Sequence, residues 1–119
     1  MDGMRLVVPI HFHGTLAANG TFRWKTPCAL TLTHVSLASS VDTNCQVKIG
    51  NTGANADAAY LALKDCGDQT AAEYARADFV DAEYPHIPAG TVLLVTVDYD
   101  GSSGTAAQNC SVVMTFVEG

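Results

Sequence analysis

The chain has 119 residues, of which 48% are hydrophobic and 15% are charged, with twelve acidic residues against six basic ones. A net charge of −6, with no basic group larger than the pair Arg23 and Lys25, excludes the cationic patch that nucleic-acid binding requires. This length predicts a single domain over residues 1–119, and so few charges predict that a partner or further copies of the chain cover apolar surface.

The sequence also indicates where the protein is made. It has no basic segment followed by an apolar leader and no apolar stretch of about 18 residues, so we expect synthesis in the cytoplasm and no membrane contact. Four cysteines, Cys28, Cys45, Cys66 and Cys110, form no C-x-x-C pair. Buried thiols are therefore predicted, and a zinc site is the alternative that the spacing does not favour.

The first strand is predicted over residues 5–13, where Leu6, Val8, Ile10 and Phe12 alternate with more polar residues and form the core face. Pro9 cannot donate to a ladder of hydrogen bonds, which places this strand at a sheet edge or at a bulge. Residues 16–20 predict a turn with the reversal signal Asn-Gly, and residues 21–26 predict a short strand.

Two further strands are expected in the next segment. Residues 28–37 predict a long strand with Leu30 and Leu32 inward, and the alternation changes phase near His34, which predicts a bulge or a bend there. Residues 44–49 predict a strand with alternate residues in the core, closed by the turn residues 50–53.

The middle third has a weaker pattern. Residues 54–64 are rich in alanine with helical spacing, so one or two turns of helix are expected. Residues 71–78 predict either a short helix or an irregular edge strand around Tyr74 and Phe79. Two prolines predict a loop over residues 84–90.

Strands with a clear two-residue period end the chain. In residues 91–99 the odd positions are apolar, in residues 110–117 the even positions are apolar, and residues 100–104 supply the reversal between them. About seven strands with regular turn signals predict an all-β fold, an antiparallel β-sandwich or jelly roll with one or two short helical turns. A closed barrel is the alternative.

The pattern His11-x-His13 could form half of a metal site, because alternate residues of a strand project from the same face. A third ligand is missing: the remaining histidines, His34 and His86, are poorly placed, and no acidic residue follows His13 closely. We therefore interpret His11 and His13 as solvent-facing or interface groups, and we predict no metal site.

No catalytic residues are predicted. The chain contains no G-x-S-x-G elbow, no phosphate-binding loop and no dinucleotide fingerprint. The acids at Asp98 and Asp100, and those at Asp78, Asp81 and Glu83, lack the spacing of a calcium loop and are interpreted as solvated turn residues. We expect a non-enzymatic protein without a cofactor.

Trp24 lies between two basic residues and admits three interpretations. It could stack on a sugar ring, anchor a subunit interface, or close the end of the sandwich while half-buried. Tyr60 and Tyr84 are the other candidate sugar platforms.

The segments Ile87–Asp98 and Ser111–Gly119 combine an I-P-A-G turn, a valine-rich strand and a last strand ending T-F-V-E-G. In this pattern the chain resembles small β-sandwich structural proteins of tailed bacteriophages, namely capsid cement (decoration) proteins and related virion accessory proteins. The resemblance implies a non-enzymatic virion protein that oligomerises, often as a trimer, on an icosahedral shell. It transfers no catalytic residue. Because the first strand begins almost at once, contact with the shell is expected from strand edges or loops rather than from an N-terminal arm.

The expected function is therefore structural: a homotrimeric subunit that stabilises a capsid by binding a major capsid protein or another virion protein. The candidate interface residues are Pro9, His11, His13, Trp24 and Tyr84. A phage fibre or carbohydrate-binding module is the alternative function, and a metalloenzyme built on the two neighbouring histidines is the third.

Overall fold

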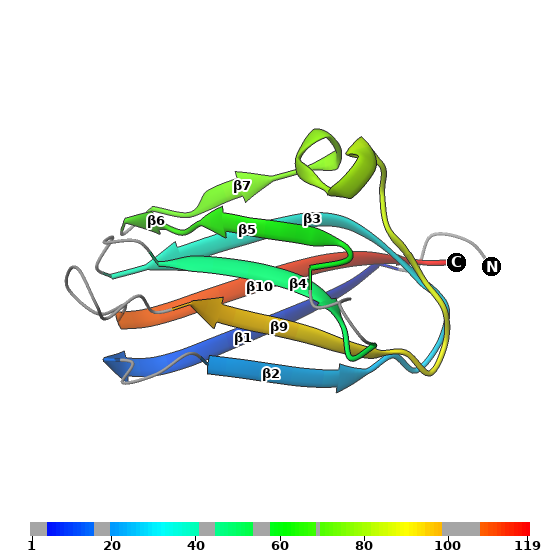
Figure 1. Ribbon diagram of the computed structural model, residues 1–119, viewed down its shortest axis with the longest axis horizontal. Helices are drawn as coiled ribbons and strands as arrows, with labels where there is room; N and C mark the ends of the chain where they lie inside the picture. The colour runs from blue at the N-terminus through cyan, green and yellow to red at the C-terminus, as the bar shows by residue number, and fades with distance from the viewer. Residues whose placement is uncertain (1–4, 16–19, 41–44, 54–57, 69, 99–107) are drawn as a thin grey trace.

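The computed structural model describes residues 5–15, 20–40, 45–53, 58–68, 70–98 and 108–119. Two sheets pack face to face into a sandwich (Figure 1). The elements are β1 (Arg5–Thr15), β2 (Gly20–Lys25), β3 (Leu30–Ser39), β4 (Gln46–Asn51), β5 (Leu61–Asp65), β6 (Gly67–Asp68), β7 (Ala72–Tyr74), the 3₁₀ turns η1 (Arg76–Asp78) and η2 (Val80–Ala82), β8 (His86–Ile87), β9 (Val92–Asp98) and β10 (Gln108–Glu118). The all-β sandwich with short helical turns is confirmed.

The strand pairing is nested. Sheet A has the order β1-β10-β3, with the short strands β6, β7 and β8 along the free side of β3, and sheet B has the order β2-β9-β4-β5. The first strand thus pairs with the last, β2 with β9, β3 with β7 and β8, and β4 with β5. All these pairs are antiparallel, and only the two-residue contact of β3 with β6 is parallel. Such nesting of two Greek keys is the jelly-roll topology.

The core lies between the two sheets and follows the predicted alternation. In β9 and β10 every second residue is buried, and both strands occupy interior positions of their sheets. The first strand also turns its even positions inward, with Ile10 buried and Leu6, Val8 and Phe12 packed against the core. The fully buried residues of the two central strands are Leu93, Val95, Val97, Cys110, Val112, Met114 and Phe116.

The predicted bulge in the third strand is confirmed. Leu32 pairs with Phe116 and His34 with Thr115, so Thr33 is the extra residue in β3. Its hydroxyl donates a hydrogen bond to the Thr115 carbonyl at 3.1 Å. The extra residue restores the register, because Leu32 and Val35 can then both face the core.

Strands that follow one another in the sequence do not always pair. The strands β9 and β10 do not pair with each other: β9 lies in sheet B and β10 in sheet A. The same holds for β1 and β2. Alternation shows which face of a strand is buried and leaves its neighbours undetermined, so sequential strands need not form hairpins. Of the turn predicted over residues 16–20 only Gly20 is described, as the start of β2, and the reversal predicted over residues 100–104 lies outside the described residues.

The helix predicted over residues 54–64 is wrong in its described second half. Leu61–Asp65 is β5, which pairs with β4, and residues 54–57 lie outside the described residues. Leu61 is fully buried beside Ile49, and this packing outweighs the weak helical preference of the alanines. The turn predicted over residues 50–53 begins later, because β4 continues to Asn51, whose side-chain oxygen accepts a hydrogen bond from the Gly53 amide.

Both interpretations of residues 71–78 apply in part. β7 is a short edge strand on β3, and η1 follows it directly. In η2 the residues Asp81 and Ala82 have φ values of 61° and 52°, so this turn is not a regular helix. The loop predicted over residues 84–90 contains the two-residue strand β8, in which Ile87 is fully buried.

Thr26 connects β2 to the loop before β9. Its buried hydroxyl donates to the Pro88 carbonyl at 2.9 Å and accepts from the Thr91 amide at 3.1 Å. Two backbone bonds reinforce the contact, from Thr26 to Thr91 and from Gly90 to Thr26. The loop is thus fixed at the point where Gly90 takes a positive φ of 78°.

We predict that Thr26→Val lowers the free energy of unfolding by about 1–2 kcal/mol, because the isosteric side chain removes the hydrogen bonds of the hydroxyl with the Pro88 carbonyl and the Thr91 amide. Urea denaturation measures the change. The control Thr26→Ser keeps the hydroxyl and should lose less than half as much. Equal stability of Thr26→Val and the native protein would contradict this role.

Candidate interaction surface

The outer face of sheet A, where β1, β10 and β3 form it, carries few charges, and Glu73 of β7 borders it. Its residues alternate with the buried ones, and the register aligns Val7 with Thr115 and Pro9 with Val113. Within the described part of β1, β10 and β3, only Arg5 carries a fixed charge among the outward positions. These positions are Arg5, Val7, Pro9, His11, Thr31, Thr33, His34, Ser36, Ala38, Asn109, Ser111, Val113, Thr115 and Val117. We call this surface the sheet A face.

Pro9 and His11 both lie on the sheet A face, as their phase in the sequence predicts. Pro9 is exposed, and β1 is an edge strand, which confirms the placement predicted from the missing N–H. His11 is exposed and its Nδ1 lies 2.9 Å from the hydroxyl of Ser111, its partner in register. The side chain of His13 lies outside the described residues. That both histidines project from the same face of the strand therefore stays a prediction.

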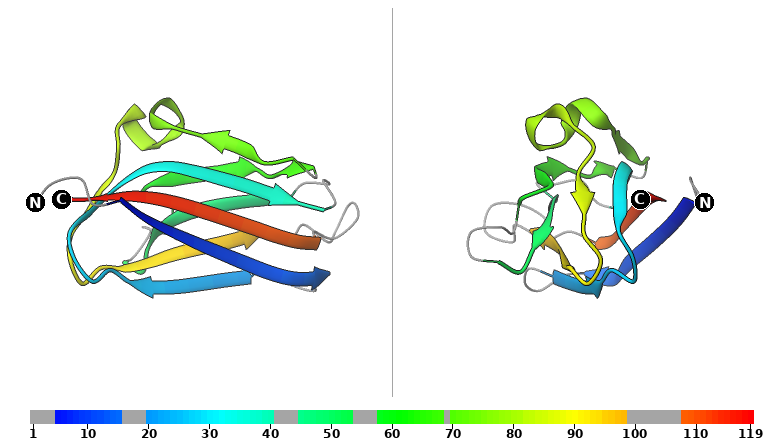
Figure 2. Two further views of the ribbon diagram at one scale, coloured as in Figure 1. Left: turned by 180° about the vertical axis from the view of Figure 1, so that it is seen from behind. Right: turned by 90° about the vertical axis from the view of Figure 1, so that its right-hand side faces the viewer.

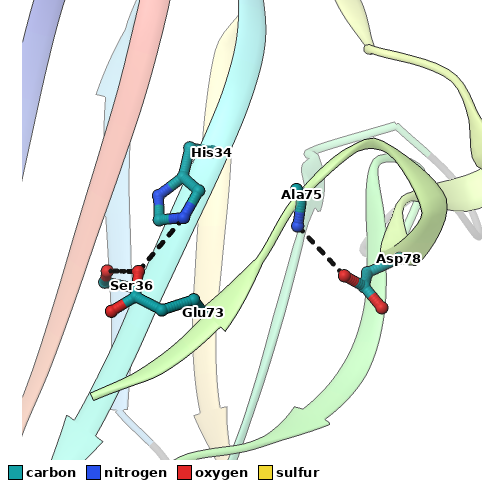
Figure 3. Close-up of polar contacts among 5 residues, drawn as sticks. All are labelled: His34, Ser36, Glu73, Ala75 and Asp78. Atoms are coloured by element: carbon teal, nitrogen blue, oxygen red, sulfur yellow. Dashed lines mark hydrogen bonds and ion pairs between the residues drawn. The ribbon is translucent and has the colours of Figure 1, made fainter.

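A polar cluster attaches β7 to the central part of sheet A (Figure 3). Glu73 on β7 accepts a hydrogen bond from the hydroxyl of Ser36 and lies 3.1 Å from His34 Nε2. In the next turn, the Asp78 carboxylate accepts a hydrogen bond from the Ala75 amide at 3.0 Å. Asp78 therefore caps η1, a more specific role than the solvated acid that its sequence context predicts.

The candidate sugar platforms do not come together. Trp24 on β2 is half-buried, and its ring centroid lies 5.7 Å from that of Phe116, so the indole closes the sandwich. The Tyr60 hydroxyl accepts a hydrogen bond from Asn51 Nδ2 at 3.3 Å. Tyr84 is 48% exposed and follows η2, with the Arg76 guanidinium 6.0 Å from its ring centroid. Since β2 and η2 lie on opposite long edges of the sandwich (Figure 1), Trp24 and Tyr84 cannot hold one ligand.

Three buried cysteines, Cys45, Cys66 and Cys110, lie close together between the sheets. The sequence did not indicate that Cys66 belongs to this cluster. The sulfur of Cys45 lies 3.3 Å from that of Cys66 and 3.1 Å from that of Cys110. Tetrahedral zinc would separate its sulfur ligands by about 3.8 Å, so these thiols are too close to enclose a metal. Among the described side chains no group of histidine, cysteine or acidic residues is placed to bind a metal ion.

Contacts within this cluster change the acidity of its members. Hydrogen bonds from Cys45 and Cys66 lower the pKa of Cys110, whereas hydrogen bonds with Cys110 and Cys45, together with burial, raise the pKa of Cys66. The prediction of buried thiols is confirmed for Cys45, Cys66 and Cys110, whereas Cys28 is partly exposed.

Tyr74 fixes the end of β7. Its hydroxyl donates a hydrogen bond of 2.6 Å to the Asp65 carbonyl, and partial burial, followed by the nearby Asp65 carboxylate, raises its pKa. This bond joins the edge of sheet A to the end of β5 in sheet B. It holds the two sheets together along that side of the sandwich.

The described residues form no pocket that could take a small molecule. Within the same residues, no helix has the length and apolar character needed to cross a membrane. What the described surface offers is therefore faces and edges rather than a cavity, and the broad face with the fewest charges is the sheet A face.

No protein-family model matches the chain, and no curated protein matches it in sequence. Among solved structures, a chain described as "Cyanophage Pam1 capsid asymmetric unit" aligns with a TM-score of 0.58 and 17% sequence identity. The alignment covers 99% of this chain and 87% of the cyanophage chain. At this identity the likeness shows a shared fold: the chain has the same β-sandwich architecture as a protein found in that capsid.

Proposed function

We propose that this protein is a non-enzymatic virion structural protein of a bacteriophage, a decoration or cement subunit that stabilises the capsid shell. The observation that carries the proposal is the fold match with a cyanophage capsid chain, because it extends over nearly the whole of both chains. The resemblance of the last two strands to phage decoration proteins points to the same class independently of the fold.

The sheet A face provides the contact with the shell in this proposal. Its side chains, such as Thr115 and Val113, are short and polar or aliphatic, and with so few charges the face loses little free energy when water is removed from it. Pro9 and His11 lie at its margin on β1. A face of this kind fits the surface between major capsid subunits, where the protein would bind after the shell assembles.

The proposal places the protein in the virion as an oligomer, with a trimer expected. An oligomer presents several copies of the sheet A face to the symmetric shell, and this multivalency strengthens binding without new contacts. It also covers the exposed edges that a lone sandwich leaves open.

The first test uses cells that carry the native gene. Lysate particles are separated on a density gradient, and the protein is detected with an antibody raised against the purified chain. We expect it to band with intact particles. A protein found only in the free fraction would contradict the proposal, and binding of the free protein to a glycan array would instead support the carbohydrate-binding alternative.

The second test asks which face binds. Purified protein is added back to particles stripped of it, and bound protein is measured by sedimentation. We expect Val113→Glu to reduce binding at least tenfold, because an unpaired charge in a buried interface costs several kcal/mol. The matched control is Thr96→Glu, which adds the same charge to the central strand of sheet B and should bind normally. Equal binding by both variants would exclude the sheet A face.

A further inference from the structure

The two long edges of the sandwich carry opposite charges. The basic edge consists of β1 and β2, which contain Arg5, Arg23 and Lys25 and no acidic residue. The acidic edge is the segment from Leu61 to Tyr84, which contains six of the twelve acidic residues of the chain and two basic ones. These edges run along opposite sides of the molecule (Figures 1 and 2).

The exposed charges sit where another molecule can reach them. On the basic edge Arg23 and Lys25 project outward from β2, the edge strand of sheet B. On the acidic edge Asp81 and Glu83 are exposed in and after η2. Asp65 on β5 and Glu73 on β7 are exposed as well.

Apolar side chains accompany the charges on both edges. Four large hydrophobic residues are markedly exposed among the described residues, and all four lie on these edges. Val7, 51% exposed, belongs to the basic edge beside the exposed Pro9. Leu63, Val80 and Tyr84, which are 41%, 38% and 48% exposed, belong to the acidic edge. Each edge therefore combines exposed apolar side chains with charges of a single predominant sign, a composition that suits a protein interface.

Charge decides which of the edges can pair. Two basic edges would repel each other, as would two acidic ones. Complementarity exists only between unlike edges.

We propose that copies of this chain associate head to tail, the basic edge of one copy against the acidic edge of the next. A heterologous contact of this kind generates a closed ring when the rotation between copies closes. This inference rests on the oligomer assumed in the proposed function. It specifies the two surfaces through which the copies contact each other. In the ring each copy uses both edges, and the part of the sheet A face that lies on β10 and β3 stays free for the shell.

The test compares charge reversals by sedimentation velocity of the purified full chain over a range of concentrations. We expect the native protein to form an oligomer that weakens as salt rises, since exposed charges are screened. R23E/K25E makes both edges acidic and should raise the dissociation constant at least tenfold. D65K/D81K/E83K leaves the acidic edge with five basic and three acidic residues, so both edges are then basic, and it should do the same. Combining all five substitutions in one chain restores opposite signs and should restore the oligomer.

Controls separate folding from association. Lys48→Glu reverses a charge on β4, an interior strand of sheet B, and should leave the oligomer intact, while circular dichroism verifies the fold of every variant. A native protein that stays monomeric at all concentrations, or a fivefold variant that stays dissociated while folded, would overturn the inference. Its failure is distinguishable from failure of the proposed function: a monomer that still bands with particles overturns only the ring, and an oligomer that never bands with particles overturns only the virion role.

Discussion

Replacing Phe116 with alanine is expected to lower the free energy of unfolding by about 3–5 kcal/mol. Phe116 is fully buried in β10, the strand between β1 and β3, and it pairs in register with Leu6 on one side and Leu32 on the other. Its ring also contacts Trp24 of sheet B. Removing the ring therefore opens a cavity shared by both sheets, which the surrounding strands cannot collapse to fill.

Two variants make this prediction specific. Phe116→Leu keeps most of the volume and should cost less than about 1.5 kcal/mol. Val117→Ala, next in the same strand but on the sheet A face, should change stability by less than about 1 kcal/mol. Urea denaturation followed by tryptophan fluorescence measures all three, because the indole contacts the ring that is removed. Similar losses for Phe116→Ala and Val117→Ala would contradict the assigned core.

Oxidation of the thiol cluster is the second large effect. We expect refolding with oxidised glutathione to form a disulfide between Cys45 and Cys110 and to raise the free energy of unfolding by about 4 kcal/mol. Their sulfurs lie 3.1 Å apart, so an approach of about 1 Å gives the bond length of about 2.05 Å. The two cysteines are 65 residues apart, and closing so long a loop restricts the unfolded chain strongly.

The measurement requires a background without the partly exposed thiol, so it starts from Cys28→Ser. Intact-mass analysis should show the loss of two hydrogens, peptide mapping should identify the linked pair, and thermal melting should report the gain. Cys110→Ala is the control: it leaves only the pair Cys45 and Cys66, 21 residues apart, which can link but closes a shorter loop and should stabilise less. A disulfide-linked protein with the same melting temperature as the reduced protein would refute the prediction.

The sequence was sufficient to predict the strands with strong alternation and the class of the fold. In residues 110–117 every second side chain is apolar, and burial on one face requires that period. The change of phase near His34 located the bulge at Thr33, because a register error of one residue would turn Leu32 or Val35 out of the core. The position of Pro9 on an edge strand followed from its missing donor.

Other features depend on contacts distant in the sequence. The sequence of β5 by itself does not distinguish a strand from a turn of helix. Its strand conformation comes from pairing with β4 and from the burial of Leu61. Cys66 lies outside any periodic segment, and it joins Cys45 and Cys110 only because the chain passes between the sheets there. The opposite charges of the two edges are likewise invisible in the sequence until the topology places β1 and β2 on one side.

The nested pairing determines when the protein can fold during synthesis. β10 is the last of the ten strands to leave the ribosome, and it supplies the middle of sheet A, between β1 and β3. Until it emerges, no strand lies between β1 and β3, and the apolar side of β1 stays exposed on the nascent polypeptide. Folding of this sheet therefore has a high contact order and slow kinetics, and the waiting chain is a natural client for a chaperone.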